Sequence, residues 1–276
     1  MDLGMLYGAV VVERLRTFQY QLANWEMHWE RFQLGCDVLG INAIDEANLF
    51  EESIQHLLSA NAGWIQSQKD VSIVVVATPG NSEFSLGNCT MYMHCLSLPW
   101  QRLRQWYQTG AALVRSKYLT GAGNCWPAPI KVRNRLAYYL ADQDAAHKSV
   151  NALGIVGNAR GNVGDTSVAN VLMIDRHGEW ISPTDDSVLV GTSLKLSANL
   201  LEHQGTTLRY RDIAWDELTQ AKEIILVGNT GCVWHANSLD GTAIGQGRRG
   251  PECERLQNLW IEHLGFDWRD QAIEHP

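Results

Sequence analysis

Lys131 stands in residues 128–136, where the sequence reads APIKVRNRL. It follows Pro127 and Pro129 closely, and a stretch with helical composition begins there and runs to about Ala146. The amine of a lysine is a nucleophile that forms Schiff bases with carbonyl compounds when its surroundings favour the neutral form. A single lysine is far more often a solvated surface residue. The assignment of Lys131 therefore depends on the residues around it.

The segment from Ile130 through Asn134 and Leu140 to residues 141–145 resembles, position by position, the Schiff-base lysine segment of the class IV aminotransferases. These are the fold-type IV pyridoxal phosphate enzymes, which include branched-chain and D-amino-acid aminotransferases. The resemblance implies that pyridoxal 5'-phosphate carries the chemistry, while the protein supplies orientation and electrostatics. It also implies that Lys131 is the catalytic residue, which binds the cofactor and afterwards moves protons.

Asp165 takes the place of the carboxylate that keeps the pyridine nitrogen of the cofactor protonated. The family pattern is a small turn, a Glu, small or hydroxyl residues, and an Asn that leads into a strand. Residues 161–171 match the turn, Thr166, Ser167 and Asn170. They depart at the carboxylate, because Asp is one methylene shorter than Glu. The alternative is a turn aspartate that bonds to its own backbone.

Arg31 matches the arginine that binds the cofactor phosphate in this family. Glu13-x-x-Arg16, expected on a strand, is followed by His28-x-x-Arg31, expected on a helix. A planar guanidinium suits bidentate phosphate contact better than an ammonium does. A helical arginine is usually solvated or ion-paired, so this motif gains weight only beside the other matches. We expect His28 to be a structural partner rather than a catalyst.

Two turns are expected to complete the phosphate site. Residues 189–193 (LVGTS) resemble the Pro-Gly-Ile-Thr turn that precedes a helix in the family, and a helix N-terminus favours anions. The other turn follows the strand at residues 224–227, where the family has Ser-Gly-Thr, and its glycine allows close backbone approach. The implied cofactor ligands in these turns are Thr192, Ser193, Gly228, Asn229 and Thr230. An ordinary connecting turn is the alternative at both places.

The elements that must position these residues fall into two expected domains. Residues 1–98 are expected to form a small α+β domain, with strands at 6–18, 71–77 and 88–96 and helices at 23–39 and 45–62. Residues 99–276 are expected to form the larger cofactor-binding domain. Its expected strands lie near 111–115, 152–157, 168–174 and 223–228, and its expected helices at 132–147, 194–204 and 251–264, the last helix.

The resemblance covers almost the whole chain, from about Tyr7 to Leu264, and implies an α+β, two-domain fold-type IV architecture. This is a small α/β domain followed by a larger mixed-sheet domain. The family carries further strands ahead of the position of Tyr7, so the N-terminal strands of the small domain are expected to be trimmed. Val12 stands where the family often has an aromatic residue against the cofactor or substrate.

Composition excludes several classes of protein. The chain has 276 residues, of which 45% are hydrophobic, and a net charge of -8, so the basic surface expected of a nucleic-acid-binding protein is absent. No apolar run approaches the roughly 20 residues needed to span a membrane, and the first residues lack the features of a signal peptide. The six cysteines are scattered and the nine histidines suggest no metal site. We expect a cytoplasmic protein with buried cysteines, although Cys125 and Cys232 fall near the expected site.

Three activities share this cofactor site within the family: branched-chain amino transfer, D-amino-acid amino transfer and aminodeoxychorismate lysis. We expect an aminotransferase of amino-acid metabolism, a homodimer whose partners are a small-molecule amino acid and a 2-oxo acid. The lyase is the alternative, because Asn134, Arg135 and Asn229 are close to its pattern. A non-catalytic or degenerate relative is the second alternative, because Asp165, Asn229 and Val12 depart from the family pattern.

Overall fold

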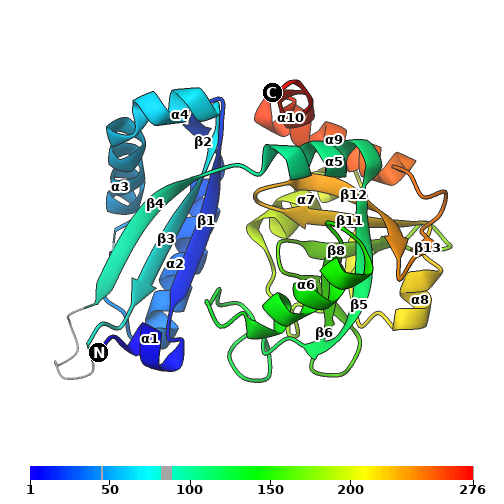
Figure 1. The fold of residues 1–276 in the computed structure, drawn as a ribbon, viewed down its shortest axis with the longest axis horizontal. Helices are drawn as coiled ribbons and strands as arrows, with labels where there is room; N and C mark the ends of the chain where they lie inside the picture. The colour runs from blue at the N-terminus through cyan, green and yellow to red at the C-terminus, as the bar shows by residue number, and fades with distance from the viewer. Residues whose placement is uncertain (45, 82–88, 276) are drawn as a thin grey trace. The chain divides into compact units, whose positions relative to one another are not determined.

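The protein is described by a computed structural model that covers residues 1–44, 46–81 and 89–275. The chain divides into two compact units (Figure 1). The first unit holds Met1–Leu98 and Pro129–Arg135, and the second holds Pro99–Ala128 and Leu136–Pro276. The segment that carries Lys131 thus belongs to the first unit, although in the sequence it stands between two segments of the second unit. In the described residues, no helix combines the length and the apolar character that crossing a bilayer requires.

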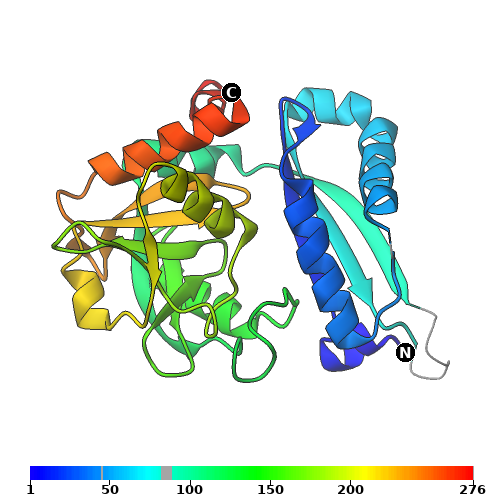
Figure 2. The same cartoon turned by 180° about the vertical axis from the view of Figure 1, so that it is seen from behind.

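The first unit is an antiparallel sheet in the order β2-β1-β3-β4 with helices beside it. Its strands are β1 (Val11–Phe18), β2 (Gln21–Leu22), β3 (Val71–Thr78) and β4 (Thr90–Ser97). Its helices are α1 (Leu3–Tyr7), α2 (Trp25–Leu39), α3 (Ala47–Ala60) and α4 (Ala62–Gln68). Figure 2 shows α2 lying along the sheet.

The two faces of this sheet have different neighbours, because successive side chains of a strand point to opposite sides. Val11 and Leu15 of β1 pack with Phe32 of α2 and Ile54 of α3 in one buried core. The alternate position Val12 belongs to a separate cluster with Val74 and Val76 of β3. Helices therefore cover one face of the sheet, and the side chain of Val12 lies on the other face.

The second unit contains a nine-stranded mixed sheet among the described residues, in the order β10-β9-β8-β11-β12-β5-β6-β7, with β13 on β12. The strands are β5 (Ala111–Leu119), β6 (Leu153–Gly157), β7 (Val163–Thr166), β8 (Asn170–Ile174), β9 (Trp180–Ser182), β10 (Leu208–Tyr210), β11 (Glu223–Gly228), β12 (Cys232–Leu239) and β13 (Thr242–Ala243). The helices are α5 (Trp100–Thr109), α6 (Leu136–Lys148), α7 (Thr192–His203), α8 (Trp215–Thr219), α9 (Pro251–Leu264) and α10 (Trp268–Glu274). The expected mixed α/β architecture is confirmed.

The expected helix at 132–147 is wrong at its start. It begins at Leu136, and the residues before it form an isolated antiparallel bridge between Val132 and Val11. The Val12 N–H donates to the Lys131 carbonyl (3.0 Å), and the Arg133 N–H donates to the Val10 carbonyl (3.1 Å). Because β2 pairs only with the far end of β1, this edge of β1 is available. Pairing with β1 gives hydrogen-bond partners to backbone N–H groups, and the first N–H groups of a helix have no partner within the helix.

Other boundaries also differ. The first strand begins at Val11 rather than at residue 6, because α1 occupies Leu3–Tyr7 and the Asp2 side chain accepts from the Gly4 N–H (2.7 Å). The helix at 251–264 is not the last helix, since α10 follows it. Position 88 of the expected third strand and position 45 of the expected second helix lie outside the described residues.

Candidate active site

Lys131 faces Val12 across the bridge between its segment and β1. Residues directly opposite in an antiparallel pair carry their side chains on the same face. Lys131 therefore belongs to the face of the first unit's sheet that Val12 marks, opposite the one that packs on α2 and α3. It is half-buried. An extended backbone, rather than a helix, presents this lysine.

Asp165 lies inside β7 and is buried, with 6% of its surface exposed. The hydroxyl of Tyr138, on α6, donates to Asp165 Oδ1 (2.7 Å). The same hydroxyl is 3.1 Å from the Thr120 hydroxyl. The alternative of a turn aspartate is wrong, because the residue is part of a strand. Its carboxylate is oriented by a side chain of another element.

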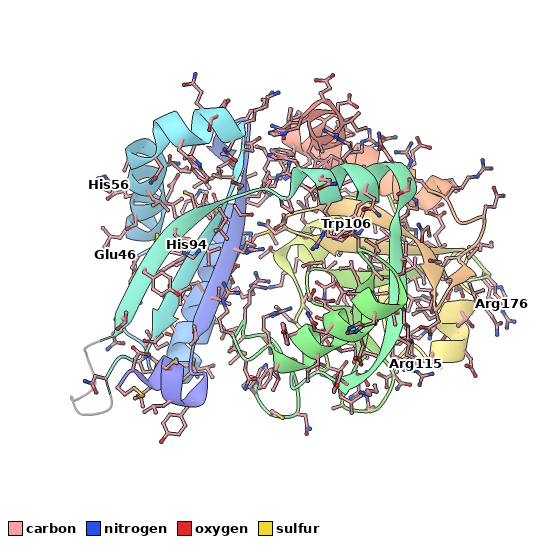
Figure 3. The ribbon with its side chains drawn as sticks, viewed as in Figure 1. Glu46, His56, His94, Trp106, Arg115 and Arg176 are labelled. Carbon is pink, nitrogen blue, oxygen red and sulfur yellow. The ribbon has the colours of Figure 1, made fainter. Side chains whose placement is uncertain are left out.

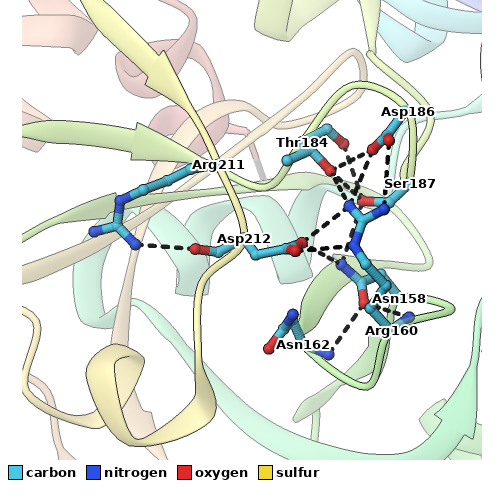
Figure 4. A network of polar contacts seen from close by, with 8 residues as sticks. All are labelled: Asn158, Arg160, Asn162, Thr184, Asp186, Ser187, Arg211 and Asp212. Carbon is cyan, nitrogen blue, oxygen red and sulfur yellow. Dashed lines mark hydrogen bonds and ion pairs between the residues drawn. The ribbon is translucent and has the colours of Figure 1, made fainter.

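A polar network holds the turn that leads into β7 (Figure 4). Asn158 Oδ1 accepts from the backbone N–H groups of Arg160 (2.9 Å) and Asn162 (3.0 Å). The Arg160 guanidinium donates to Asp212 (2.9 Å) and Asp186 (3.0 Å). Its hydrogen bond holds the pKa of Asp186 below its ordinary value. Such a network fixes the start of β7, two residues before Asp165.

The N-terminus of α7 contains Thr192 and Ser193, both buried. Asn170 organises the preceding turn: its amide donates to the Leu189 carbonyl (2.7 Å), and its Oδ1 accepts from the Gly191 N–H (3.0 Å). A Cβ on Gly191 would lie 2.5 Å from Asn170 Oδ1, so only glycine fits there.

The Ser193 Oγ is buried and has no hydrogen-bond partner among the described residues. Buried hydroxyls are nearly always paired, and each exception calls for an explanation such as an absent ion or ligand. The N-terminal end of a helix and its dipole favour an anion at the same place. This end of α7 therefore fits a phosphate.

Gly228 ends β11 beside the same region. Asn170 pairs with Val227 across β8 and β11, so the turn after Gly228 lies next to the strand end that holds the α7 turn. A Cβ on Gly228 would collide with the Val168 carbonyl oxygen. Asn229 and Thr230 follow as half-buried residues of the turn into β12. The second unit thus brings its two expected phosphate turns together.

Arg31 is buried in a charged cluster of the first unit. Its Nε and Nη2 donate to the two oxygens of Glu13 (2.7 and 2.8 Å), and His28 Nδ1 lies 2.7 Å from Glu13 Oε2. Burial alone would raise the pKa of Glu13. The charge and hydrogen bonds of Arg31 and His28 outweigh burial and lower that pKa to about 2. The Arg31 Nη1 donates to none of the described residues.

The sequence model described as "Amino-transferase class IV" matches residues 10–239. The chain belongs to the class IV aminotransferase family.

Curated relatives of this class IV aminotransferase family member are of two kinds. Branched-chain-amino-acid aminotransferase-like protein 2 of Arabidopsis thaliana is 23% identical over 256 residues, which are 92% of this chain and 45% of the relative. D-alanine aminotransferase of Bacillus licheniformis is 22% identical over 262 residues, 93% of this chain and 88% of the relative. The chain spans about half the length of the first curated relatives it matches, at 45% and 46%.

Solved structures share the fold of this family member. The branched-chain amino acid aminotransferase of Escherichia coli superposes with a TM-score of 0.85 at 18% identity, covering 95% of this chain and 88% of that one. A Legionella pneumophila protein assigned as a 4-amino-4-deoxychorismate lyase gives a TM-score of 0.79 at 17% identity, covering 95% and 94%. At these identities the likeness shows the fold alone.

The expected site residues divide between the units. Lys131 and Arg31 belong to the first, and the others belong to the second: Asp165, Thr192, Ser193, Gly228, Asn229 and Thr230. Of the two cysteines expected near the site, Cys125 is exposed, whereas Cys232 is buried.

Two residues with structural roles at this site were not predicted. Tyr138 carries no local signal, because one tyrosine in an apolar helix looks like any core residue. Glu13 is expected only as part of a motif, and the two hydrogen bonds that it accepts from Arg31 form because β1 and α2 pack together.

Proposed function

We propose that this protein is a pyridoxal-phosphate-dependent aminotransferase that moves an amino group between an amino acid and a 2-oxo acid, of the branched-chain or D-amino-acid type. The observation that carries the proposal is the buried Ser193 Oγ, unpaired among the described residues, at the N-terminus of α7. Family membership over residues 10–239 supports the same activity. A branched-chain amino acid aminotransferase that shares the fold has been solved with pyridoxamine 5'-phosphate.

The residues of the second unit fit the two ends of this cofactor. Ser193, Thr192 and the turn Gly228–Thr230 would hold the phosphate, where hydroxyls and backbone N–H groups favour an anion. Asp165 would pair with the protonated ring nitrogen, and the Tyr138 hydroxyl would hold that carboxylate in place. An Asp in the position of a Glu needs such a support, because its side chain is one methylene shorter and its backbone is held in a strand.

When bound, pyridoxal phosphate draws off the negative charge that develops at the α-carbon of the substrate. Lys131 Nζ would hold the cofactor through a covalent bond. The same nitrogen would also be the base that accepts and returns a proton at the α-carbon of the substrate. Arg31 would add a phosphate contact through Nη1, while its Nε and Nη2 each donate to Glu13.

A lyase that releases pyruvate from aminodeoxychorismate is the second candidate. Two features of the sequence favour it, Asn134-Arg135 after Lys131 and Asn229 in the phosphate turn. A non-catalytic or degenerate relative, which either binds the cofactor without catalysis or has lost it, is a further alternative.

A half-reaction screen separates these candidates. The purified protein loaded with pyridoxal phosphate is mixed with single L- and D-amino acids, and its absorbance spectrum is followed. Conversion to the pyridoxamine form by an amino acid supports the aminotransferase. Pyruvate release from aminodeoxychorismate without such conversion supports the lyase, and a colourless protein that cannot be reconstituted contradicts both.

We further propose a homodimer that works in the cytoplasm on small-molecule substrates. All six cysteines are thiols, which suits a reducing compartment. The resemblance to homodimeric enzymes supports the assembly. Light scattering coupled to gel filtration measures the mass, and a monomer across micromolar concentrations would contradict the dimer.

A further inference from the structure

The strand β4 forms an open edge of the first unit's sheet. The order β2-β1-β3-β4 places it at one end of that sheet (Figure 1), and all eight of its residues are paired with β3. Within the described residues, no backbone–backbone hydrogen bond joins β4 to any segment other than β3. An edge strand of this kind presents a row of unpaired N–H and C=O groups to a further strand.

The other sheet edges among the described residues are short, and proteins commonly protect their edges with short strands, charged side chains or proline. At the opposite end of the small sheet, β2 has two residues, and the bridge from Val132 to Val11 takes up another part of β1. In the second unit, the end strands β10 and β7 have three and four residues and contain Arg209 and Asp165. In contrast, β4 reads TMYMHCLS, with no charged residue that is ionised at neutral pH and no proline.

Both faces of β4 carry side chains that suit a second strand. On one face, sulfur-containing side chains pack against the helix-covered core: Met91, Met93 and Cys95. The alternate residues Tyr92 and His94 therefore lie on the other face, and their rings are stacked with centroids 5.9 Å apart (Figure 3 labels His94). Tyr92 is 52% exposed and Leu96 is 39% exposed. The edge thus combines open backbone groups with exposed apolar surface.

We propose that β4 pairs in antiparallel fashion with β4 of a second copy of this chain, which joins two four-stranded sheets into one across a two-fold axis. The inference rests on the proposed homodimer and specifies its interface. A two-fold contact uses the same surface on both copies, so one long edge per chain gives a dimer and no further growth. The strand offers no charge by which a charged partner strand could be recognised, whereas it matches its own sequence.

Symmetry restricts the register of this pairing. A two-fold axis that relates two antiparallel edge strands is perpendicular to the sheet, so the helices of both copies lie on the same side. Residues directly opposite each other share a face. With Met93 on the axis, Tyr92 lies opposite the partner's His94, which extends the aromatic stack. An axis at His94 would set two histidines against each other, and an axis at Tyr92 would leave residues 95–97 without a partner.

Cysteine cross-linking of the cofactor-loaded protein tests the register, in a background where the exposed or half-buried Cys89, Cys95 and Cys125 are replaced by serine. Met93→Cys should form a disulfide-linked dimer, because opposite Cα atoms are about 4.5–5.5 Å apart, within the span of a disulfide. In Tyr92→Cys the two introduced thiols stand diagonally, with Cα atoms about 7–8 Å apart, so cross-linking should be at least about tenfold slower.

A charge variant tests the interface itself. Tyr92→Lys/His94→Lys places lysines directly opposite one another, which disfavours strand pairing. We expect its dimer dissociation constant, measured by analytical ultracentrifugation, to rise at least about tenfold. Leu34→Lys/Val38→Lys is the matched control, because it adds the same charges to the same unit at positions of α2 that are 42% and 46% exposed. The control should keep the wild-type dissociation constant.

The outcomes separate this inference from the proposed function. A dimer that keeps its dissociation constant in Tyr92→Lys/His94→Lys and gives no Met93→Cys cross-link would overturn the β4 interface and leave the homodimer standing. Equal cross-linking of Met93→Cys and Tyr92→Cys would also overturn it, and a monomeric wild type would refute both. If the lysine variant does not fold, the cross-linking result decides alone. A protein that dimerises through β4 but takes up no pyridoxal phosphate would refute the proposed function and leave this interface standing.

Discussion

The hydroxyl of Tyr138 donates to a carboxylate buried within β7, and this pair determines how Asp165 is oriented. A strand residue cannot shift to meet a ligand as a loop residue can. In the proposed enzyme, the shorter Asp is therefore useful only if its carboxylate is held at one angle. The Tyr138 hydroxyl provides that constraint.

We expect Tyr138→Phe to lower the half-reaction rate about tenfold, the effect of losing one charge-assisted hydrogen bond. The measurement is the rate of the spectral change on adding an amino acid. Tyr139→Phe is the matched control, because Tyr139 is the next residue on α6 and is 61% exposed. Equal rates in the two variants would show that the Asp165 contact is not used in the reaction.

Ser193 and Ser197 lie one turn apart on α7, and their hydroxyls differ in what they bond. Ser193 Oγ has no partner among the described residues, whereas Ser197 Oγ donates to the Ser193 carbonyl (2.8 Å) and accepts from Trp260 Nε1 (3.0 Å). We expect Ser193→Ala to weaken pyridoxal phosphate binding about tenfold and to leave stability nearly unchanged. Ser197→Ala should do the opposite, with a loss of about 1–3 kcal/mol. Cofactor titration and urea unfolding measure the two effects, and loss of stability in both variants would contradict the phosphate role.

At the scale of elements, long periodic segments could be predicted, and the pairing of distant segments could not. The apolar run of β3 and the spacing of α2 and α9 gave boundaries within about two residues. The extended backbone at Lys131 was missed, because it depends on an open edge of β1 more than a hundred residues earlier in the chain. Local sequence carries no information on such an edge.

Glu13 joins β1 to α2 through Arg31 and His28. We expect Glu13→Gln to lower the free energy of unfolding by about 3–5 kcal/mol, because it leaves a buried arginine without its counter-charge. Glu30→Gln, an exposed position on α2, is the control. Chemical denaturation at neutral pH measures both.

The same carboxylate predicts an acid transition. The pKa of Glu13 falls from 4.5 to about 2 on folding, so the stabilisation is complete above pH 4.5 and is lost as the pH falls toward 2. In Glu13→Gln this part of the pH dependence should vanish. Parallel acid curves for variant and wild type would contradict the assignment.

At the scale of the whole molecule, the site residues are distributed over two units that the chain visits alternately. Lys131, Asp165 and the two phosphate turns are expected site residues because each lies in a short local pattern that resembles the family. The supports of these residues, such as Tyr138 and Asn158, could not be predicted. They come from other elements, and their hydrogen bonds exist only after the sheet has formed.

His235 of β12 sets a second acid transition for the folded molecule. It is buried, and its two ring nitrogens have no hydrogen-bond partner in the described part of the chain. Burial, and then the positive charge of Arg249, lower the pKa of His235 from 6.5 to about 4. Between these two pH values the unfolded chain binds a proton at this histidine and the folded protein does not. The free energy of unfolding therefore falls by about 3 kcal/mol as the pH drops from 6.5 to 4.

We expect His235→Phe to flatten the dependence of the unfolding free energy on pH between 6.5 and 4. The pH dependence that Glu13 causes, from pH 4.5 toward 2, should remain. Unfolding in urea across this range is the measurement, with the exposed His177→Gln as the control. A curve for His235→Phe that keeps the wild-type slope would assign the transition to another group.

The central claim is that Lys131 binds pyridoxal phosphate covalently. The most direct test is borohydride reduction of the loaded protein, followed by digestion and mass spectrometry of all lysine-containing peptides. We expect a phosphopyridoxyl group on Lys131 alone, and none in Lys131→Arg, whose spectrum should lack the yellow band. A label absent from Lys131, or spread evenly over the other lysines, would contradict the account.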